Sequence, residues 1–373
     1  YYMDRQQLAY RIGFGWVRGM NRTLAADVLA RLGSVQAFFE ESESRLRYIS
    51  QSRSRIYAAD YRLSLLEKAR SEVDFIERNS IRTLYYTDAA YPATLTQCDD
   101  APLMMYGLGD TDLNDCRMIG VVGTRHATPY GLDFTARLIE ELAAMTPGLV
   151  VASGLAYGID VAAHRAALRC GVPTVAVLAH GLNTIYPADH RSVAVEMIRK
   201  GGMLLSDYRS DEPVHKGNFV ARNRIVAGMS HCLVVVESAE RGGALITAGL
   251  AADYGRDVFA VPGRVSDTYS AGCNRLIGAN AATLVRSASD VCMAMGWPIH
   301  SDSDPTDSAA LPLPLNADEE AIVKFLHSSE DSMLAQIAVA TGIGAGKLMS
   351  LLIDMEFRGL ILSLPGGRYR CLL

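Results

Sequence analysis

The sequence has 373 residues, of which 49% are apolar and 21% charged, a composition ordinary for a globular protein of two or three domains. Its formal net charge of −5 excludes an overall basic field, so a site for nucleic acid would have to be local. The 7 cysteines include no C-x-x-C pair, and no apolar run approaches the ~20 residues of a membrane span. With a polar segment at residues 1–7 where a signal peptide would be apolar, these features predict a cytoplasmic protein with no metal, no disulfide framework and no membrane partner.

Residues 1–78 show helical periodicity and no run typical of a strand. Leu24, Val28 and Leu32 recur at helical spacing, and Gly33 is placed to end that helix. The glycine turns of this segment resemble a helix-hairpin-helix or SAM-like module, which either grips a nucleic-acid backbone or only packs; we favour packing. Residues 80–110, which include two prolines, are mixed in character and are expected to form an apron that leads into the sheet.

Residues 79–296 alternate short apolar runs with helical segments, which predicts an α/β fold with a doubly wound, mostly parallel sheet. Runs of β-branched residues without polar alternation suit strands that are buried on both faces. The expected strands are 118–122, 149–152, 173–178, 203–206, 232–237 and 257–260. The expected helices lie near 129–144, 158–169, 188–199 and 244–254.

The end of the chain predicts a flexible, proline-containing linker at 297–317 and a separate unit at 318–373. Three helical segments followed by a hairpin are the outline of a winged helix, with Ser332 as a candidate cap of the second helix. The third helix carries only Lys347 and Arg358 as cations, so we expect a packing or partner-contact unit that does not read duplex DNA. Thr341 stands where a P-loop needs its first glycine, so no nucleotide cofactor is expected here.

Small turns follow several of the expected strands, and parallel strands bring such turns to one edge of the sheet. Backbone N–H groups at helix starts, together with an arginine, suit a phosphate. A salt bridge at the sheet edge is the alternative role for Arg125. Several turns on one edge predict an extended anion track, with these residues: Gly123, Thr124, Arg125, Ser153, Gly154, Gly242, Gly243, Gly263 and Asn274.

Asp160 and His164 are four residues apart and therefore share one helix face. They are an acid–base pair, a metal site, or residues whose structural hydrogen bond fixes the helix to the loop. Because the sequence supplies neither a third ligand nor a nucleophile, we favour the structural role and assign no catalytic residue.

Residues 215–224 concentrate cations around an aromatic ring and contain no acid. Cations that neutralise phosphates, next to an aromatic ring on which a base can stack, are what single-stranded nucleic acid requires. Lys216 and Phe219 are expected to face the ligand. The candidate residues of this segment are Lys216, Asn218, Phe219, Arg222, Asn223 and Arg224.

Apolar residues at 225–227 follow this segment, so one of its arginines is expected to be structural. Arg222 or Arg224 would then be partly buried, paired with the carboxylate of Glu237 or Asp207.

These motifs, taken in order, resemble the DNA-processing protein A family, also called DprA or Smf. The resemblance spans the whole α/β segment, and the helical start and winged-helix end fit the same layout. It rests on Gly-Thr-Arg at 123–125, Ser-Gly-Leu-Ala-Tyr-Gly-Ile-Asp at 153–160 with Ala163-His164, Asn218-Phe219 with Arg-Asn-Arg-Ile-Val-Ala-Gly at 222–228, Gly-Gly-Ala-Leu-Ile-Thr at 242–247, and Gly255 to Gly263.

The resemblance implies an extended Rossmann-like fold that dimerises through that domain and binds single-stranded DNA. It implies protection of incoming DNA and loading of a RecA-type recombinase during natural transformation. Arg125 matches the family's phosphate clamp, and Lys216 with Phe219 its second DNA-contacting cluster. Tyr157 stands where the family often has arginine, and Val220-Ala221 replace a proline and a frequently basic residue, so DNA contacts there are in doubt.

An enzyme is the rival interpretation. The sheet and glycine turns also resemble lysine-decarboxylase-like phosphoribohydrolases, which cleave a base from a nucleoside monophosphate and carry Pro-Gly-Gly-x-Gly-Thr followed by a catalytic Glu. Here Leu245 replaces a glycine of that motif, and 248–252 contain no acid. The absence of a nucleophile–base set favours a protein that is not an enzyme. A purely structural partner-binding protein would leave the basic segment at 215–224 unexplained.

Overall fold

The computed structural model describes residues 4–297, 315–328, 332–358, 360–364 and 367–371. Internal contacts divide the chain into two compact units, Tyr1–Asp302 and Ser303–Leu373. The linker expected at 297–317 lies outside the described residues over 298–314. Among the described residues, no single helix is long and apolar enough to cross a membrane; one bent pair, Leu334–Thr341 with Ala345–Glu356, passes by length and composition only.

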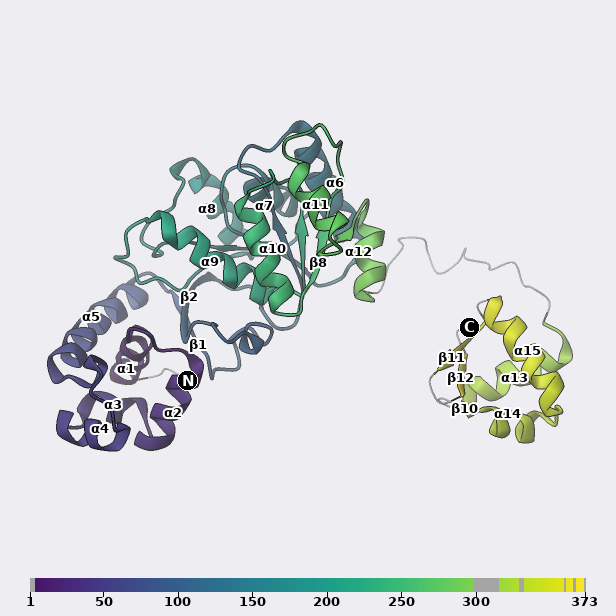
Figure 1. The fold of residues 1–373 in the computed structure, drawn as a ribbon, viewed down its shortest axis with the longest axis horizontal. Coiled ribbons are helices and arrows are strands. Elements are labelled where there is room, and N and C mark those ends of the chain that lie inside the picture. The colour runs from purple at the N-terminus through teal and green to yellow at the C-terminus, as the bar shows by residue number, and fades with distance from the viewer. Residues whose placement is uncertain (1–3, 298–314, 329–331, 359, 365–366, 372–373) are drawn as a thin grey trace. The chain divides into compact units, whose positions relative to one another are not determined.

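A nine-stranded sheet organises the first unit, in the order β1-β2-β6-β5-β4-β3-β7-β8-β9. Helices surround this sheet (Figure 1). The strands from β6 to β9 run parallel, and β2 and β1 extend the β6 edge in antiparallel pairing. The strands are β1 Arg82–Tyr85, β2 Met104–Gly109, β3 Arg117–Val122, β4 Leu149–Ser153, β5 Thr174–Val177, β6 Met203–Ser206, β7 Cys232–Val235, β8 Asp257–Ala260 and β9 Thr283–Leu284.

The doubly wound α/β fold predicted from the sequence is confirmed, and the expected strands and helices match observed ones to within a few residues. The expected strands did not include β1 and β2, which residues 80–110 contribute to the sheet. The helices that accompany the sheet are α6 Pro129–Met145, α7 Ile159–Arg169, α8 Arg191–Arg199, α9 Lys216–Met229, α10 Gly243–Asp253, α11 Ala271–Gly278 and α12 Ala288–Met295, with the short 3₁₀ helices η2 Leu95–Gln97 and η3 Ala188–His190.

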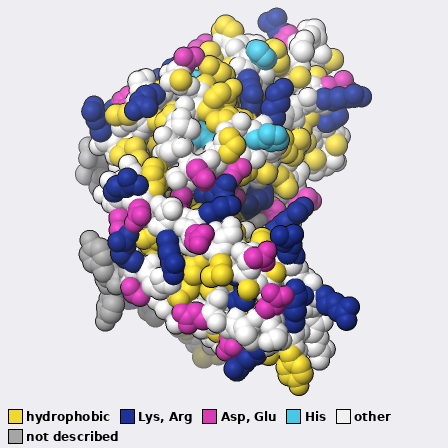
Figure 2. All heavy atoms as spheres, turned by 90° about the vertical axis from the view of Figure 1, so that its left-hand side faces the viewer, with side chains coloured by type: hydrophobic (Ala, Val, Ile, Leu, Met, Phe, Trp, Pro, Cys, Tyr) yellow, Lys and Arg dark blue, Asp and Glu magenta, His cyan; other side chains and the backbone are white. Residues whose placement is uncertain are grey.

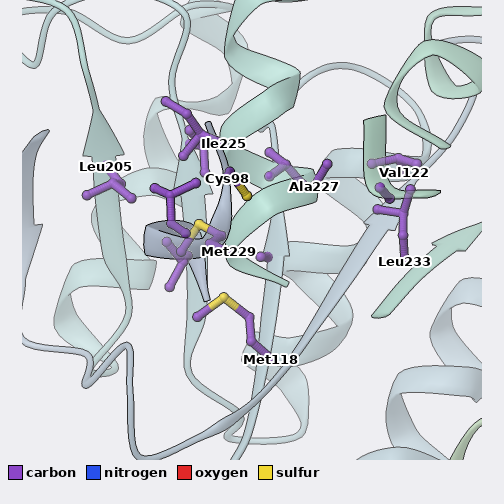
Figure 3. Close-up of a cluster of buried hydrophobic side chains, with 14 of the residues drawn as sticks. Cys98, Met118, Val122, Leu205, Ile225, Ala227, Met229 and Leu233 are labelled. Carbon is purple, nitrogen blue, oxygen red and sulfur yellow. The ribbon is translucent and has the colours of Figure 1, made fainter. Parts of the chain in front are cut away.

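Alternation along β3 supplies the two faces of the core. Ile119 and Val121 pack with α6 and α7 on one face, whereas Met118 and Val122 join the cluster beneath α9 and α10 on the other. Figure 3 shows this second cluster, in which Ile225, Ala227 and Met229 of α9 lie among side chains from the strands. The buried C-terminal half of α9 therefore anchors a helix whose first turns remain at the surface.

The order in which the chain adds strands to the sheet reverses at β3. From β3 the chain adds β4, β5 and β6 on one side, and it then returns to place β7 on the other side of β3. In open parallel sheets, ligands bind outside the carboxyl ends of the strands at such a switch point. The turns after β3 and β7 are therefore where the fold itself predicts a site.

The N-terminal helices belong to the same compact unit as the sheet. They share a hydrophobic cluster with Tyr85, Met104 and Tyr106 of β1 and β2. Glu72 of α5 is buried, and its carboxylate accepts hydrogen bonds from the backbone N and Oγ of Ser210, 2.9 and 2.7 Å away. The elements are α1 Arg5–Gly15, α2 Arg22–Leu32, α3 Val35–Glu40, α4 Glu43–Ser50, η1 Arg55–Tyr57 and α5 Ala59–Arg78.

The second unit has the three helices and hairpin of a winged helix, as predicted, with a short third strand pairing onto the hairpin. The helix expected to be capped by Ser332 begins at Leu334, after Met333. Lys347 pairs with Asp318, and Arg358 pairs with Glu319 at 2.7 Å, so both cations predicted for the third helix form ion pairs with acids. Its elements are α13 Ala317–Ser328, β10 Ser332–Met333, α14 Leu334–Thr341, α15 Ala345–Phe357, β11 Ile361–Leu364 and β12 Arg368–Cys371.

Candidate nucleic-acid interface

The turn after β3 is fixed by the two elements beside it. The backbone N of Thr124 donates to the carbonyl of Glu237 at 2.7 Å, and the backbone N of Ile159 donates to the carbonyl of Thr124 at 3.2 Å. A Cβ on Gly123 would lie 2.5 Å from Cγ1 of Ile159, so only glycine permits this packing. The sequence thus places Arg125 on a rigid support at the switch point.

Arg125 is exposed, and within the described part of the chain its guanidinium makes no ion pair and no hydrogen bond. The salt bridge considered as its alternative role is therefore not present there. The guanidinium lies 5.2 Å from the ring centroid of Phe219, which projects from the first turns of α9. Such a pair can bind one nucleotide at two points, because the cation contacts a phosphate while the aromatic ring stacks on a base.

A cleft of about 390 Å³ opens beside Arg125, between the turns after β3, β4 and β7. Its floor includes the start of α10, where Gly242 precedes the helix and no side chain caps it. Free N–H groups at a helix start favour an anion. Exposed Arg241 adds a second cation to the rim.

Arg222 lines this cleft, but its guanidinium is hydrogen bonded to backbone carbonyls of the protein. Its side chain is 3% exposed, and its guanidinium donates to the carbonyl of Gly154 at 2.7 Å and to that of Val177. The backbone N of Gly154, whose carbonyl accepts from Arg222, donates to Asp160 at 3.2 Å. A Cβ on Gly154 would lie 2.3 Å from the guanidinium, so glycine is required where this arginine crosses.

The second arginine of the segment is structural as well. Arg224 pairs with Asp207 at 2.5 Å and donates to the carbonyl of Asp100 at 2.6 Å. The expected partner Asp207 is therefore correct for Arg224, and Glu237 is wrong for either arginine. Glu237 instead accepts from the backbone N and hydroxyl of Thr128, at the start of α6. We expected one structural arginine, and the structure gives both that role.

Asp160 and His164 do not bond to each other. His164 is fully buried, and its Nδ1 lies 2.7 Å from Oγ1 of Thr174, whereas Asp160 binds the loop before its helix. Burial raises the pKa of Asp160 against the opposing pull of Arg222. Burial, with the nearby Arg222 charge, lowers the pKa of His164 to about 3. The favoured structural role of Asp160 is confirmed by its bond to that loop.

The other predicted site residues divide by accessibility. Lys216 is exposed at the start of α9 and Phe219 is half-buried. Asn218 is half-buried, and its Nδ2 has no hydrogen-bond partner among the described residues. By contrast, Ser153 is buried and donates to the carbonyl of Val121 at 2.6 Å.

Two predicted asparagines have internal partners. Asn274 donates to the carbonyl of Gly263 at 3.0 Å and accepts from its backbone N at 3.2 Å, so both ends of its amide are used. The Oδ1 of Asn223 accepts from Nε of Arg222 at 3.2 Å, although Asn223 still lines the cleft. Gly243 lines the cleft at the start of α10.

Sequence reasoning missed several residues around this edge. Tyr186 contacts Phe219 with ring centroids 5.6 Å apart, and it is 46% exposed. Tyr269 and His126 line the cleft with their rings stacked 6.3 Å apart. These residues were not predicted because single aromatic residues in loops show no periodicity in the sequence. Only the topology of the fold brings them together.

The face drawn in Figure 2 carries Lys and Arg side chains interspersed with hydrophobic and acidic ones, and they do not merge into one continuous basic surface. This mixed distribution agrees with the net charge of −5. On this face, therefore, the cations form no broad basic surface for a polyanion.

Fold and site together define a doubly wound α/β protein with a separate winged-helix unit and an aromatic, cationic edge at its switch point. Among the described residues, no group of three or more His, Cys, Asp or Glu is placed to hold a metal ion.

The chain belongs to the DprA family. The family model described as DNA recombination-mediator protein A matches residues 82–296, and that of the DprA winged helix domain matches 306–367. Protein Smf of Escherichia coli is 33% identical over 289 residues, covering 75% of this chain and 75% of that protein. DNA processing protein DprA of Streptococcus pneumoniae is 40% identical over 204 residues, covering 55% of this chain and 71% of that one.

Solved structures agree. The crystal structure of DprA from Streptococcus pneumoniae matches with a TM-score of 0.63 at 30% identity, over 80% of this chain and 99% of that one. A structure of DprA from Helicobacter pylori, described as showing its single-stranded DNA binding mode, matches with a TM-score of 0.51 at 30% identity, over 58% of this chain and 95% of that one.

Proposed function

We propose that this chain binds single-stranded DNA, without sequence preference, along the edge formed by the turns after β3 and β7 and the first turns of α9. The observation that carries the proposal is Arg125, an exposed guanidinium without an ion pair in the described chain, held 5.2 Å from the ring of Phe219. One phosphate on Arg125 and an adjacent base on Phe219 would use both groups. The H. pylori relative, whose title names single-stranded DNA binding, supports the same reading.

A single strand suits this site better than a duplex. A base stacks on Phe219 only if its face is free, whereas the bases of a duplex are stacked on one another. The second unit adds little to duplex binding, because Lys347 and Arg358 on its third helix are paired with acids. Phosphate contacts of this kind position the strand and carry no sequence information.

We propose binding without turnover. Asp160, which lines the cleft, and Glu237, which follows β7, are both buried and are hydrogen bonded to Gly154 and Thr128 respectively. A phosphoribohydrolase needs a carboxylate that reaches its substrate, and these two are committed to holding loops.

Binding of labelled oligo-dT, followed by fluorescence anisotropy beside a duplex of equal length, tests this proposal. We expect single-strand preference and an affinity that falls as salt rises. No binding at low salt would overturn the proposal. Release of free base from nucleoside monophosphates incubated with the protein would establish the enzyme instead.

We further propose that the DNA-bound protein is a cytoplasmic homodimer, joined through the α/β domain, that loads a RecA-type recombinase onto incoming DNA in natural transformation. The name of the matched family, DNA recombination-mediator protein A, supports the mediator role. Light scattering after size exclusion tests the dimer. Faster assembly of recombinase filaments on coated single strands tests the loading, and a failure of either result would remove that part of the proposal.

A further inference from the structure

Three aromatic side chains from separate segments extend the contact between Arg125 and Phe219. Phe219 comes from α9, Tyr186 from the loop before η3, and Tyr157 from the turn before α7. Tyr186 is 46% exposed and Tyr157 is 42% exposed. We call these three side chains the aromatic wall.

Contacts join the wall to the guanidinium in sequence. The Arg125 guanidinium lies 5.2 Å from the Phe219 ring, and the Phe219 and Tyr186 ring centroids are 5.6 Å apart with an interplanar angle of 60°. The hydrogen bond to Asp189, together with burial and the charges of Asp189 and Tyr186, raises the pKa of Tyr157. The hydroxyl of Tyr157 bonds to Asp189, three residues after Tyr186, so Tyr157 adjoins the segment that carries the second ring.

Neighbouring groups hold the outer ring in place. The hydroxyl of Tyr157 donates to Asp189 at 2.9 Å, and its ring meets the His190 ring edge-on at 4.9 Å. His190 is itself buried, with its Nδ1 2.8 Å from the carbonyl of Leu155. A ring that is already ordered loses little conformational entropy when a base stacks on it.

Resting on the proposed function, we propose that the aromatic wall is a stacking subsite of the DNA path. The strand places one phosphate on Arg125, and the unpaired bases that follow stack in turn on Phe219, Tyr186 and Tyr157. None of the three rings carries positive charge, so the wall binds bases rather than phosphates. Its contribution should therefore depend on the presence of bases and hardly at all on salt.

The test uses the full chain with oligo-dT and with an abasic oligonucleotide of the same length and backbone. Tyr157→Ala and Tyr186→Ala should each weaken oligo-dT binding by about fivefold or more, the low end of what one stacked base contributes. Neither variant should change the affinity for the abasic strand or the salt dependence. Tyr157→Phe, which keeps the ring and loses the bond to Asp189, should bind more tightly than Tyr157→Ala, and Tyr186→Phe should bind like the wild type.

Each outcome decides between the wall and its alternatives. Oligo-dT binding that is unchanged in both alanine variants, with wild-type binding intact, would overturn the wall and leave the proposed function standing. An equal loss for oligo-dT and the abasic strand would also overturn it, because the tyrosines would then act on the backbone path or on folding. A wild-type protein that binds neither strand would defeat the proposed function and the wall together.

Discussion

The substitution Arg222→Met tests whether the side chain of Arg222 stabilises the fold or binds DNA. The guanidinium of Arg222 is buried and donates to the carbonyls of Gly154 and Val177, and methionine keeps most of the apolar stem. The variant leaves two buried acceptors without a donor, at roughly 1–3 kcal/mol each. It also leaves the buried carboxylate of Asp160 without the cation that opposes the rise in its pKa.

We therefore expect Arg222→Met to lower the free energy of unfolding by about 4 kcal/mol, the middle of the range that two such acceptors give. Arg125→Met is the matched control, because its guanidinium is exposed and makes no ion pair among the described residues. A surface substitution of this kind should stay within about 0.5 kcal/mol of the wild type.

Urea unfolding followed by tryptophan fluorescence measures both variants. The 2 tryptophans, Trp16 and Trp297, belong to the first unit, so the signal reports the unit that contains Arg222. The reasoning would be refuted if Arg222→Met were as stable as the wild type and had lost DNA binding. Arg222 would then be a ligand contact rather than a clamp on the loop after β4.

Three further predictions follow from the same geometry. Phe219→Ala should weaken oligo-dT binding by about 1–3 kcal/mol with an unchanged salt slope, and unaltered affinity would remove Phe219 from the site. A chain ending at residue 302 should bind oligo-dT like the full chain, and a collapse of binding would show DNA contacts in the second unit. Because the folded protein holds the pKa of His164 near 3, the unfolded chain gains a proton that the folded one lacks below about pH 6.5. The free energy of unfolding should fall there by up to about 1.4 kcal/mol per pH unit as pH drops; His164→Asn should flatten that slope between pH 5 and 6.5, and an equal slope would contradict the assignment.

The sheet was predictable because its strands are short apolar runs that hydrophobic burial dictates locally. The position of Arg125 at the carboxyl edge of the sheet followed from the same runs, whereas the switch point depends on the strand order, which the sequence did not predict. Strands β1 and β2 were missed because prolines lie between them and their pairing is antiparallel to the rest of the sheet.

The roles of the arginines in α9 were only partly predictable. Asp207 was predicted as a partner and pairs with Arg224, but the partner of Arg222 was not predicted, because the carbonyl that Arg222 binds belongs to Gly154, 68 residues away. The helical state of 216–229 was also not foreseen, since a dense charge run obscures the apolar spacing that its buried half provides. Such pairings depend on topology, which a local pattern does not encode.

The most direct test of the central claim is the salt dependence of oligo-dT binding for the wild type beside Arg125→Ala. Phosphate contacts release counterions, so a single lost contact should reduce the slope of log affinity against log salt by about 0.7 on a single strand and weaken binding at low salt. That result would place Arg125 on a phosphate. Equal affinity and equal slope in the two proteins would contradict the account and move the DNA path away from the switch point.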